Sequence, residues 1–236
     1  MFRLKAEQLP KYKNIPAVVL GNGPSRLHYD INALKGRCIV FGCNRIWQDY
    51  KPEGTPFFFG ACDETIYESL IGHENILKEA PLIVPHNHYI LDHYEMSHIN
   101  FFERYPWKNT GRAMLKMALL LGCSPIFILG FSDQPIKTDF GFLENVYQHD
   151  IRKSGWRFAS NRDTSKSIVG NFHRELLELT KKYPQSFWRI GDHSQLLKNI
   201  PMVEWNDLIR NLPVKYRWKR HGPIGSSADF ELSDGS

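Results

Sequence analysis

A glycine-rich turn is the first part of the sequence whose residue types suggest chemistry. It follows an apolar run at residues 17–20 and consists of Gly21, Asn22, Gly23, Pro24 and Ser25. Glycines let the backbone approach a ligand closely, and free N–H groups in such a turn can hold a phosphate. The turn is neither the GxGxxG fingerprint nor a P-loop, because no Gly-Lys-Ser/Thr follows it. It predicts a ligand-binding turn, and an ordinary tight turn is the alternative.

Polar residues also follow three further apolar runs. Asn44 and Arg45 come after residues 38–41, Asp63 comes after residues 57–59, and Asp133 comes shortly after residues 126–129. In a sheet of parallel strands the carboxyl ends meet at one edge, and ligands bind outside that edge. Polar residues at four strand ends therefore favour a nucleotide-sized site over four unrelated turns.

A helix start adds to the same predicted site. Thr110 is the expected N-cap of a helix, and Gly111 follows it, so free N–H groups are available there. The ligand-binding residues that we predict from the strand ends and this helix start are Gly21, Asn22, Gly23, Ser25, Asn44, Thr110 and Gly111.

Two residues are candidate catalytic bases. Histidine suits this role because its unperturbed pKa lies near neutrality, and His149 stands beside Asp150, a carboxylate that could orient it. Asp63 could act as a base or a metal ligand, or only cap a turn. His173 lies one helical turn ahead of Leu176, so packing is its expected role.

A run of histidines between residues 86 and 98 could suggest a metal site. Zinc sites need three or four converging ligands at recognised spacings, and the pattern His-x-His-x4-His-x4-His matches none of them. We therefore predict no metal site.

The elements that must position these residues are short and mostly unbroken apolar runs. Such runs are typical of strands buried on both faces. Six of them predict strands, at residues 17–20, 38–41, 57–59, 82–84, 126–129 and 187–190. Helical stripes lie between them, from Met114 to Leu121 and from Phe172 to Leu179. Strands alternating with helices predict an α/β fold, a Rossmann-like and mainly parallel sheet flanked by helices.

Two segments fall outside this rhythm. Residues 132–168 have weak periodicity, and loops of this length usually serve as lids or binding loops. This predicted lid contains the basic residues Arg152, Lys153, Arg157 and Arg162. Residues 222–236 are rich in Gly, Ser and Asp and predict a flexible tail. We expect one nucleotide-binding domain over residues 1–221.

Composition narrows the function classes. The chain has 236 residues, of which 42% are hydrophobic and 23% charged, as in soluble globular proteins. No apolar run is long enough to span a bilayer and the start lacks a signal-peptide core, so we expect a cytoplasmic protein. The four cysteines, none in a CxxC pair, are expected to be buried thiols. The net charge of +5 suits an anionic ligand but is too small to indicate DNA binding by itself.

The motifs resemble those of a known family. The turn from Gly21 to Ser25, followed by Cys43-Asn44-Arg45, resembles a glycine-asparagine turn and an Arg-Cys-Asn segment of bacterial lipooligosaccharide sialyltransferases. The helix from Thr110 and the run Ile126 to Gly130 are similar to their Ser-Gly helix and the strand after it. The same skeleton resembles a wider group with flagellin-glycosylation proteins and archaeal 6-hydroxymethylpterin diphosphokinase. The likeness covers roughly residues 16–133.

The resemblance implies roles for individual residues. In the sialyltransferases, two asparagines and the helix start hold the CMP part of the donor, which here implies Asn22, Asn44, Thr110 and Gly111. The family also has a catalytic histidine before the next helix. At that place this sequence has residues 163–166, Asp-Thr-Ser-Lys, so His149 does not match it by position.

Three functions follow as hypotheses. The leading one is a glycosyltransferase that uses a nucleotide sugar as co-substrate, needs no cofactor, and transfers the sugar to a glycan or other hydroxyl acceptor. The second is a pterin-type diphosphokinase, which would need Mg²⁺ held by carboxylates such as Asp63 and Asp133. The third is a DNA-modifying transferase or nucleic-acid-binding module, based on the basic and aromatic residues from Lys215 to Arg220. The sequence leaves the oligomeric state open.

Overall fold

The computed structural model describes residues 2–4, 12–61, 66, 82–85, 100–102, 110–131, 136–138, 141–143, 174–184, 186–191, 197–219 and 231–234. Its centre is one sheet of nine strands in the order β1-β6-β5-β4-β3-β2-β7-β10-β11, and every pairing in it is parallel. The strands are β1 (Phe2–Leu4), β2 (Ala17–Leu20), β3 (Ile39–Cys43), β4 (Phe57–Gly60), β5 (Leu82–Pro85), β6 (Asn100–Phe102), β7 (Ile126–Leu129), β10 (Phe187–Ile190) and β11 (Met202–Val203). The predicted fold class is confirmed, and the strand order reverses its direction between β2 and β7.

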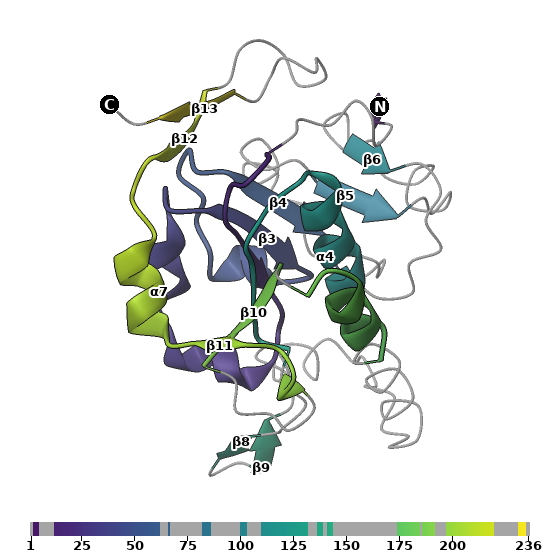
Figure 1. The fold of residues 1–236 in the computed structure, drawn as a ribbon, viewed down its shortest axis with the longest axis vertical. Coiled ribbons are helices and arrows are strands. Elements are labelled where there is room, and N and C mark those ends of the chain that lie inside the picture. Colours follow the sequence, from purple (N-terminus) through teal and green to yellow (C-terminus); the bar gives the residue numbers. More distant parts are fainter. Residues whose placement is uncertain are drawn as a thin grey trace.

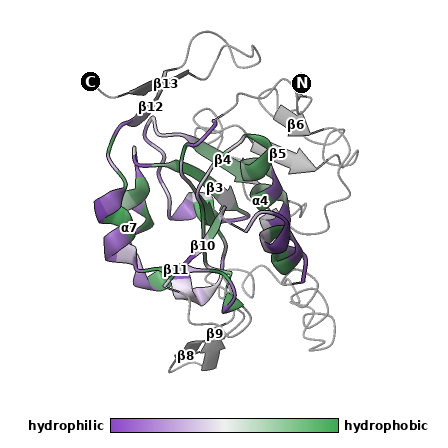
Figure 2. Ribbon diagram, viewed as in Figure 1, coloured by the Kyte–Doolittle hydropathy of each residue, from purple (hydrophilic) through white to green (hydrophobic). Residues whose placement is uncertain are grey.

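Apolar layers cover both faces of this sheet. The helices α4 (Thr110–Leu120) and α7 (Trp205–Asn211) lie on opposite sides of it (Figure 1). Val19, Ile128 and Phe187 belong to the layer under α4, whereas Val18, Leu129 and Ile190 belong to the layer under α7. Successive strand residues point to opposite faces, so a strand covered on both sides has to be apolar throughout. That explains the unbroken runs, which appear as green strands between the helices in Figure 2.

Helix α4 shows how the sequence sets one of these layers. Met114, Met117, Ala118 and Leu121 are all at most 1% exposed, and they lie on one side of the helix facing the sheet. Each fully buried large apolar side chain stabilises the fold by about 1.5 to 3 kcal/mol. Gly122 ends the helix with φ of 81°, and its N–H donates to the Leu119 carbonyl while the Cys123 N–H donates to Ala118. This is a Schellman ending, which turns the chain into β7.

The connections around β3 are short 3-10 helices. Three short 3-10 helices lie in segments for which no helical stripe was predicted: η2 (Pro24–His28) and η3 (Ile31–Leu34) before β3, and η4 (Ile46–Gln48) after it. A proline and a capping aspartate, Asp30, divide the first connection into pieces of four or five residues, too short for a stable α-helix. The predicted second helix is present, since residues 174–182 are helical.

Two small antiparallel sheets stand apart from the main one. β8 (Ile136–Thr138) pairs with β9 (Gly141–Leu143) inside the predicted lid, of which no other part is described. β12 (Tyr216–Lys219) pairs with β13 (Glu231–Asp234), so four residues of the predicted tail form a strand. The domain boundaries, the lid and the tail remain predictions. Within the described residues, no helix is long and apolar enough to cross a membrane.

Candidate functional site

The centre of the candidate site is the point where β2 and β7 end side by side. The N–H of Gly21 donates to the Leu129 carbonyl at 2.7 Å, and the N–H of Gly23 donates to the Gly130 carbonyl at 2.7 Å. A Cβ atom on Gly21 would collide with the Gly130 carbonyl, and one on Gly130, where φ is 77°, would lie 2.8 Å from the Gly21 oxygen. Two glycines are therefore needed for this backbone contact. We call the residues that follow β2, β3, β4 and β7, with the start of α4, the carboxyl edge.

Several buried side-chain atoms at the carboxyl edge have no hydrogen-bond partner among the described residues. They include Oδ1 of Asn22, Oγ of Ser25, Oδ1 of Asn44 and Nε of Arg45. Buried polar atoms in folded proteins are nearly always hydrogen-bonded, because leaving one unpaired costs about 1 to 3 kcal/mol. We call such buried atoms without a partner orphan atoms. Several of them lie together at the ends of β2 and β3, which indicates that their side chains bind a ligand.

The backbone around Asn44 explains part of that residue's identity. Its φ is 56°, in the left-handed region, where asparagine is tolerated better than most residues. Its N–H donates to the Gly60 carbonyl at 2.8 Å, which ties the ends of β3 and β4 together. The turn accounts for an asparagine here, but it leaves the orphan side-chain oxygen unexplained.

A partly buried ion pair connects the turn after β2 to the segment after β3. Arg26, only 3% exposed, lies in η2, and its Nη2 is 2.7 Å from Oδ2 of Asp49. A Cβ on Gly130 would lie 3.4 Å from the Cβ of Arg26, so this arginine also packs against the end of β7. The sequence did not single out either residue, because a pair separated by 23 positions leaves no local pattern.

The start of α4 completes the carboxyl edge. Thr110 and Gly111 are its first residues, and both are buried. Because α4 precedes a parallel strand, it runs back across the sheet, so its positive N-terminal end lies at the carboxyl edge. Arg112 contacts Glu175 with 2.6 Å between Nη1 and Oε1. Burial, helped by Arg112, lowers the pKa of Lys116 against the opposing effect of Glu175.

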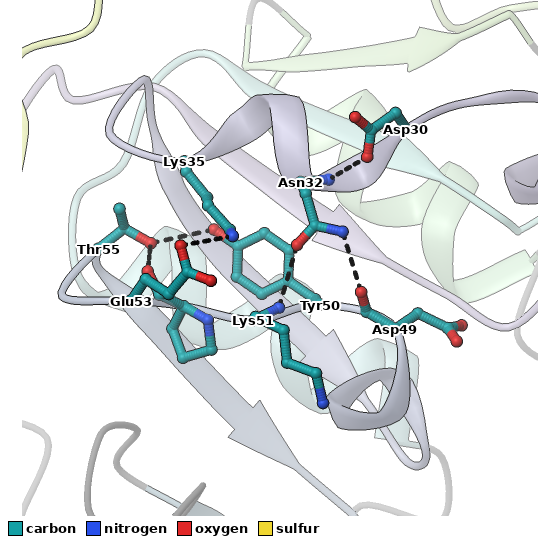
Figure 3. A network of polar contacts seen from close by, with 9 residues as sticks. Asp30, Asn32, Lys35, Asp49, Tyr50, Lys51, Glu53 and Thr55 are labelled. Atoms are coloured by element: carbon teal, nitrogen blue, oxygen red, sulfur yellow. Dashed lines mark hydrogen bonds and ion pairs between the residues drawn. The ribbon is translucent and has the colours of Figure 1, made fainter.

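Polar residues at the opposite edge of the sheet are paired with one another instead. We call the residues that lead into β3 and β4, namely 30–37 and 50–55, the amino edge (Figure 3). Asn32 is at its centre: its Nδ2 donates to the Asp49 carbonyl at 3.0 Å, and its Oδ1 accepts from the Lys51 N–H at 3.2 Å. Tyr50 and Thr55 share a buried hydroxyl contact of 3.2 Å. No buried side-chain polar atom of these described residues lacks a hydrogen-bond partner.

Several predicted residues lie outside the described part of the chain. These include His149, Asp63, the histidines at 86–98 and the basic residues of the lid. Of the basic and aromatic patch, Tyr216 is 6% exposed and starts β12, so its ring is not a free surface for base stacking. Lys215 places its Nζ 5.1 Å from that ring's centroid. Nothing in the described residues supports a nucleic-acid function.

The comparisons with known proteins concern the fold. No known family profile matches the sequence, and no characterised protein matches it significantly. Among solved structures, the monofunctional alpha-2,3-sialyltransferase Cst-I from Campylobacter jejuni matches with a TM-score of 0.55 and 17% identity, over 97% of this chain and 92% of that one. The sialyltransferase CstII from the same organism, in complex with the substrate analogue cytidine-5'-monophosphate, matches with a TM-score of 0.50 and 14% identity, over 95% and 91% of the two chains.

A third structure is larger than this chain. The MAf glycosyltransferase from Magnetospirillum magneticum AMB-1 has a TM-score of 0.47 and 14% identity, and the match covers 87% of this chain but only 35% of that one. The two Campylobacter matches show that this chain has the fold of those sialyltransferases. The ligand-binding and catalytic roles of individual residues remain predictions.

Proposed function

We propose that the protein is a glycosyltransferase that takes a sugar from a nucleotide donor and transfers it to a hydroxyl of a glycan or another acceptor. The observation that carries the proposal is the group of orphan buried atoms on Asn22, Ser25 and Asn44. Asn22 and Ser25 follow β2, where the strand order reverses, and Asn44 follows the neighbouring strand β3. Open parallel sheets bind nucleotides at such a reversal. The fold shared with the two sialyltransferases, one of them solved with a cytidine nucleotide, supports the same reading.

The proposed chemistry uses the carboxyl edge to hold the donor. The acceptor oxygen forms a bond to the anomeric carbon, and the bond from that carbon to the phosphate oxygen breaks. The nucleotide leaves with the bonding electrons, and a base takes the proton of the hydroxyl. The developing charge on the leaving phosphate would be stabilised by N–H groups at the start of α4. His149 and Asp63 are the proposed bases.

The finer parts of the proposal concern the lid, the donor and metals. Residues 132–168 would close over the donor, with Arg152 and Arg157 facing its phosphates, and exclude water from the reaction. A sialic acid donor is the finer reading suggested by the resemblance. We propose that transfer needs no metal, whereas the diphosphokinase alternative requires Mg²⁺. Turnover that survives EDTA favours glycosyl transfer over diphosphate transfer.

The decisive experiment is a thermal-shift panel of CMP, UDP, GDP and ATP on the wild-type protein. A nucleotide at 100 times its dissociation constant stabilises the fold by about 2.7 kcal/mol. Asn22→Ala should weaken binding of the preferred nucleotide by about 1 to 3 kcal/mol, because one buried hydrogen bond is lost. Asn44→Gly should do the same, and glycine keeps the left-handed turn free of strain.

The matched control is Asn32→Ala at the amino edge. It should lower the melting temperature of the free protein but leave the nucleotide-induced shift unchanged, because Asn32 bonds only to neighbouring backbone groups. The proposal is wrong if no nucleotide shifts the wild-type protein. If Asn22→Ala and Asn44→Gly both bind the nucleotide with wild-type affinity, the nucleotide does not bind at the carboxyl edge.

A further inference from the structure

Arg45 differs from the other arginines around the sheet. It follows Asn44 directly after β3 and is partly buried. Its Nε atom is shielded from solvent without a hydrogen-bond partner, and within the described residues its guanidinium forms no ion pair. It precedes η4 without forming a side-chain cap to it. Arginine is seldom buried unless it is paired, so this state needs an explanation.

The other arginines near the same strand ends show what pairing looks like in this protein. Arg26 contacts the carboxylate of Asp49, and Arg112 contacts that of Glu175. At the opposite end of β3, Arg37 donates from Nη1 to the Leu212 carbonyl at 2.6 Å and from Nε to the Ala33 carbonyl at 3.1 Å. Each of these three arginines has a carboxylate or carbonyl partner, whereas Arg45 has no counter-charge among the described residues.

We propose that Arg45 binds the phosphate of the donor nucleotide and thereby sets the preference of the site for a nucleotide over a nucleoside. This inference rests on the proposed function and adds a specific contact to it. A guanidinium offers a planar fork of N–H donors that matches two phosphate oxygens, and the pairing is strongest where water is partly excluded. A bound phosphate would supply the counter-charge that the described residues do not.

The position of Arg45 fits a phosphate rather than the nucleoside. Asn22 and Asn44 carry orphan carbonyl oxygens, which accept hydrogen bonds and suit the N–H and O–H groups of a base or ribose. Arg45 only donates, so it requires an acceptor, and the phosphate is the acceptor-rich part of a nucleotide. Neighbouring residues at the end of one strand would thus recognise different parts of one ligand.

The test compares nucleosides with their monophosphates by isothermal titration calorimetry. Cytidine with CMP and uridine with UMP are the probes, because each pair differs by one phosphate. We expect R45Q to lower affinity for the preferred monophosphate by about 10- to 100-fold and to leave affinity for its nucleoside unchanged. The difference in monophosphate affinity between wild type and R45Q should become smaller as NaCl rises from about 50 to 500 mM, since salt screens the contact.

R37Q is the control, because it removes an arginine from the other end of the same strand. It should lower stability and leave the ratio of monophosphate to nucleoside affinity as in the wild type. R45K covers the case in which R45Q does not fold: it keeps the charge and loses the fork, so about a 3- to 10-fold loss for the monophosphate alone is expected.

Three results would overturn the inference. Equal monophosphate affinity in the wild type, R45Q and R45K would show that Arg45 does not bind phosphate, with the proposed function intact. A parallel loss for nucleoside and monophosphate would assign Arg45 a structural role. Failure of the wild type to bind any of the four probes or any nucleotide of the thermal-shift panel would overturn the proposed function, and this inference with it.

Discussion

The two ends of strand β3 carry similar polar residues in different states. At the amino edge, Asn32 and Arg37 donate to backbone carbonyls from neighbouring segments. At the carboxyl edge, Asn44 and Arg45 have buried atoms that pair with nothing in the described residues. Both edges belong to the same nine-stranded sheet. Polar groups with a structural role are hydrogen-bonded within the protein. Buried polar groups that are not hydrogen-bonded lower its stability, and they indicate where a ligand binds.

Asp49 lies between the two edges and belongs to both. Its carboxylate contacts Arg26 under the glycine turn, and its backbone carbonyl accepts from Asn32. Asp49 therefore takes part in both edges through different groups, its carboxylate at the carboxyl edge and its backbone carbonyl at the amino edge.

The largest expected effect is a difference in stability loss when each of two glycines with a left-handed φ is replaced by alanine. Gly130 at the carboxyl edge has φ of 77° and Gly54 at the amino edge has φ of 75°, but only Gly130 is in contact with another backbone segment. Gly130→Ala should lower the free energy of unfolding by about 3 kcal/mol, from backbone strain and the collision with Gly21. Gly54→Ala should lower it by only about 1 kcal/mol.

Urea unfolding of both variants checks this prediction. Equal losses would mean that the contact between the ends of β2 and β7 is looser than the structure shows. A Gly130→Ala protein of wild-type stability would contradict the close approach altogether.

The second prediction compares Ser25 with Asn32 in the absence of ligand. Ser25→Ala removes a buried hydroxyl that has no partner, so the free energy of unfolding should stay constant or rise slightly. Asn32→Ala removes two hydrogen bonds that are near the surface, and should lower it by about 1 to 2 kcal/mol. Chemical denaturation without nucleotide measures both; a clear loss of stability in Ser25→Ala would show that its hydroxyl serves the fold.

The smallest expected effect concerns the sheet interior between the two edges. Burial raises the pKa of Cys123 to about 12, and burial also raises the pKa of Cys38. Unfolded thiols titrate near 9, so the unfolded chain binds fewer protons than the folded one above that pH. Stability is then complete below about pH 8 and declines as pH rises, by less than about 1 kcal/mol between pH 8 and 9.

Denaturant unfolding at both pH values tests this. The double variant Cys38→Ala, Cys123→Ala should lose this part of the pH dependence. If its unfolding free energy still falls with pH as in the wild type, other groups cause the decline. Burial raises the pKa of Tyr12 and of Tyr50 as well, so a further decline is expected above pH 10.

The sequence predicted the central strands well because they are covered on both faces. The expected runs at 17–20, 126–129 and 187–190 coincide with β2, β7 and β10. β1, β6 and β11 were missed, since two or three residues at the outer part of a sheet give too little pattern to detect. The 3-10 connections around β3 were not predicted either, because segments of three to five residues are too short to show a helical stripe.

The sequence predicted where the candidate site lies, but not which of its side chains form ion pairs or hydrogen bonds with one another. Parallel strands bring their carboxyl ends together, so Asn22 and Asn44 were expected at one edge, where the structure places them. The burial of Arg26 depends on Asp49, and the opposed states of Arg37 and Arg45 depend on distant carbonyls. Such partners are fixed by tertiary packing. His149 and Asp63 lie outside the described residues, so the assignment of the base stays a prediction.

The pairing of β2 with β7 also constrains the order of folding. Val19 lies opposite Ile128, so the two strands that frame the glycine turn are about a hundred residues apart along the chain. β7 must leave the ribosome before it can pair with β2 beside the glycine turn. Closing so long a loop is slow relative to forming a helix. Ligand affinity would then appear late and all at once during synthesis. A fragment that ends before β7 should have none of it, however well its first strands are formed.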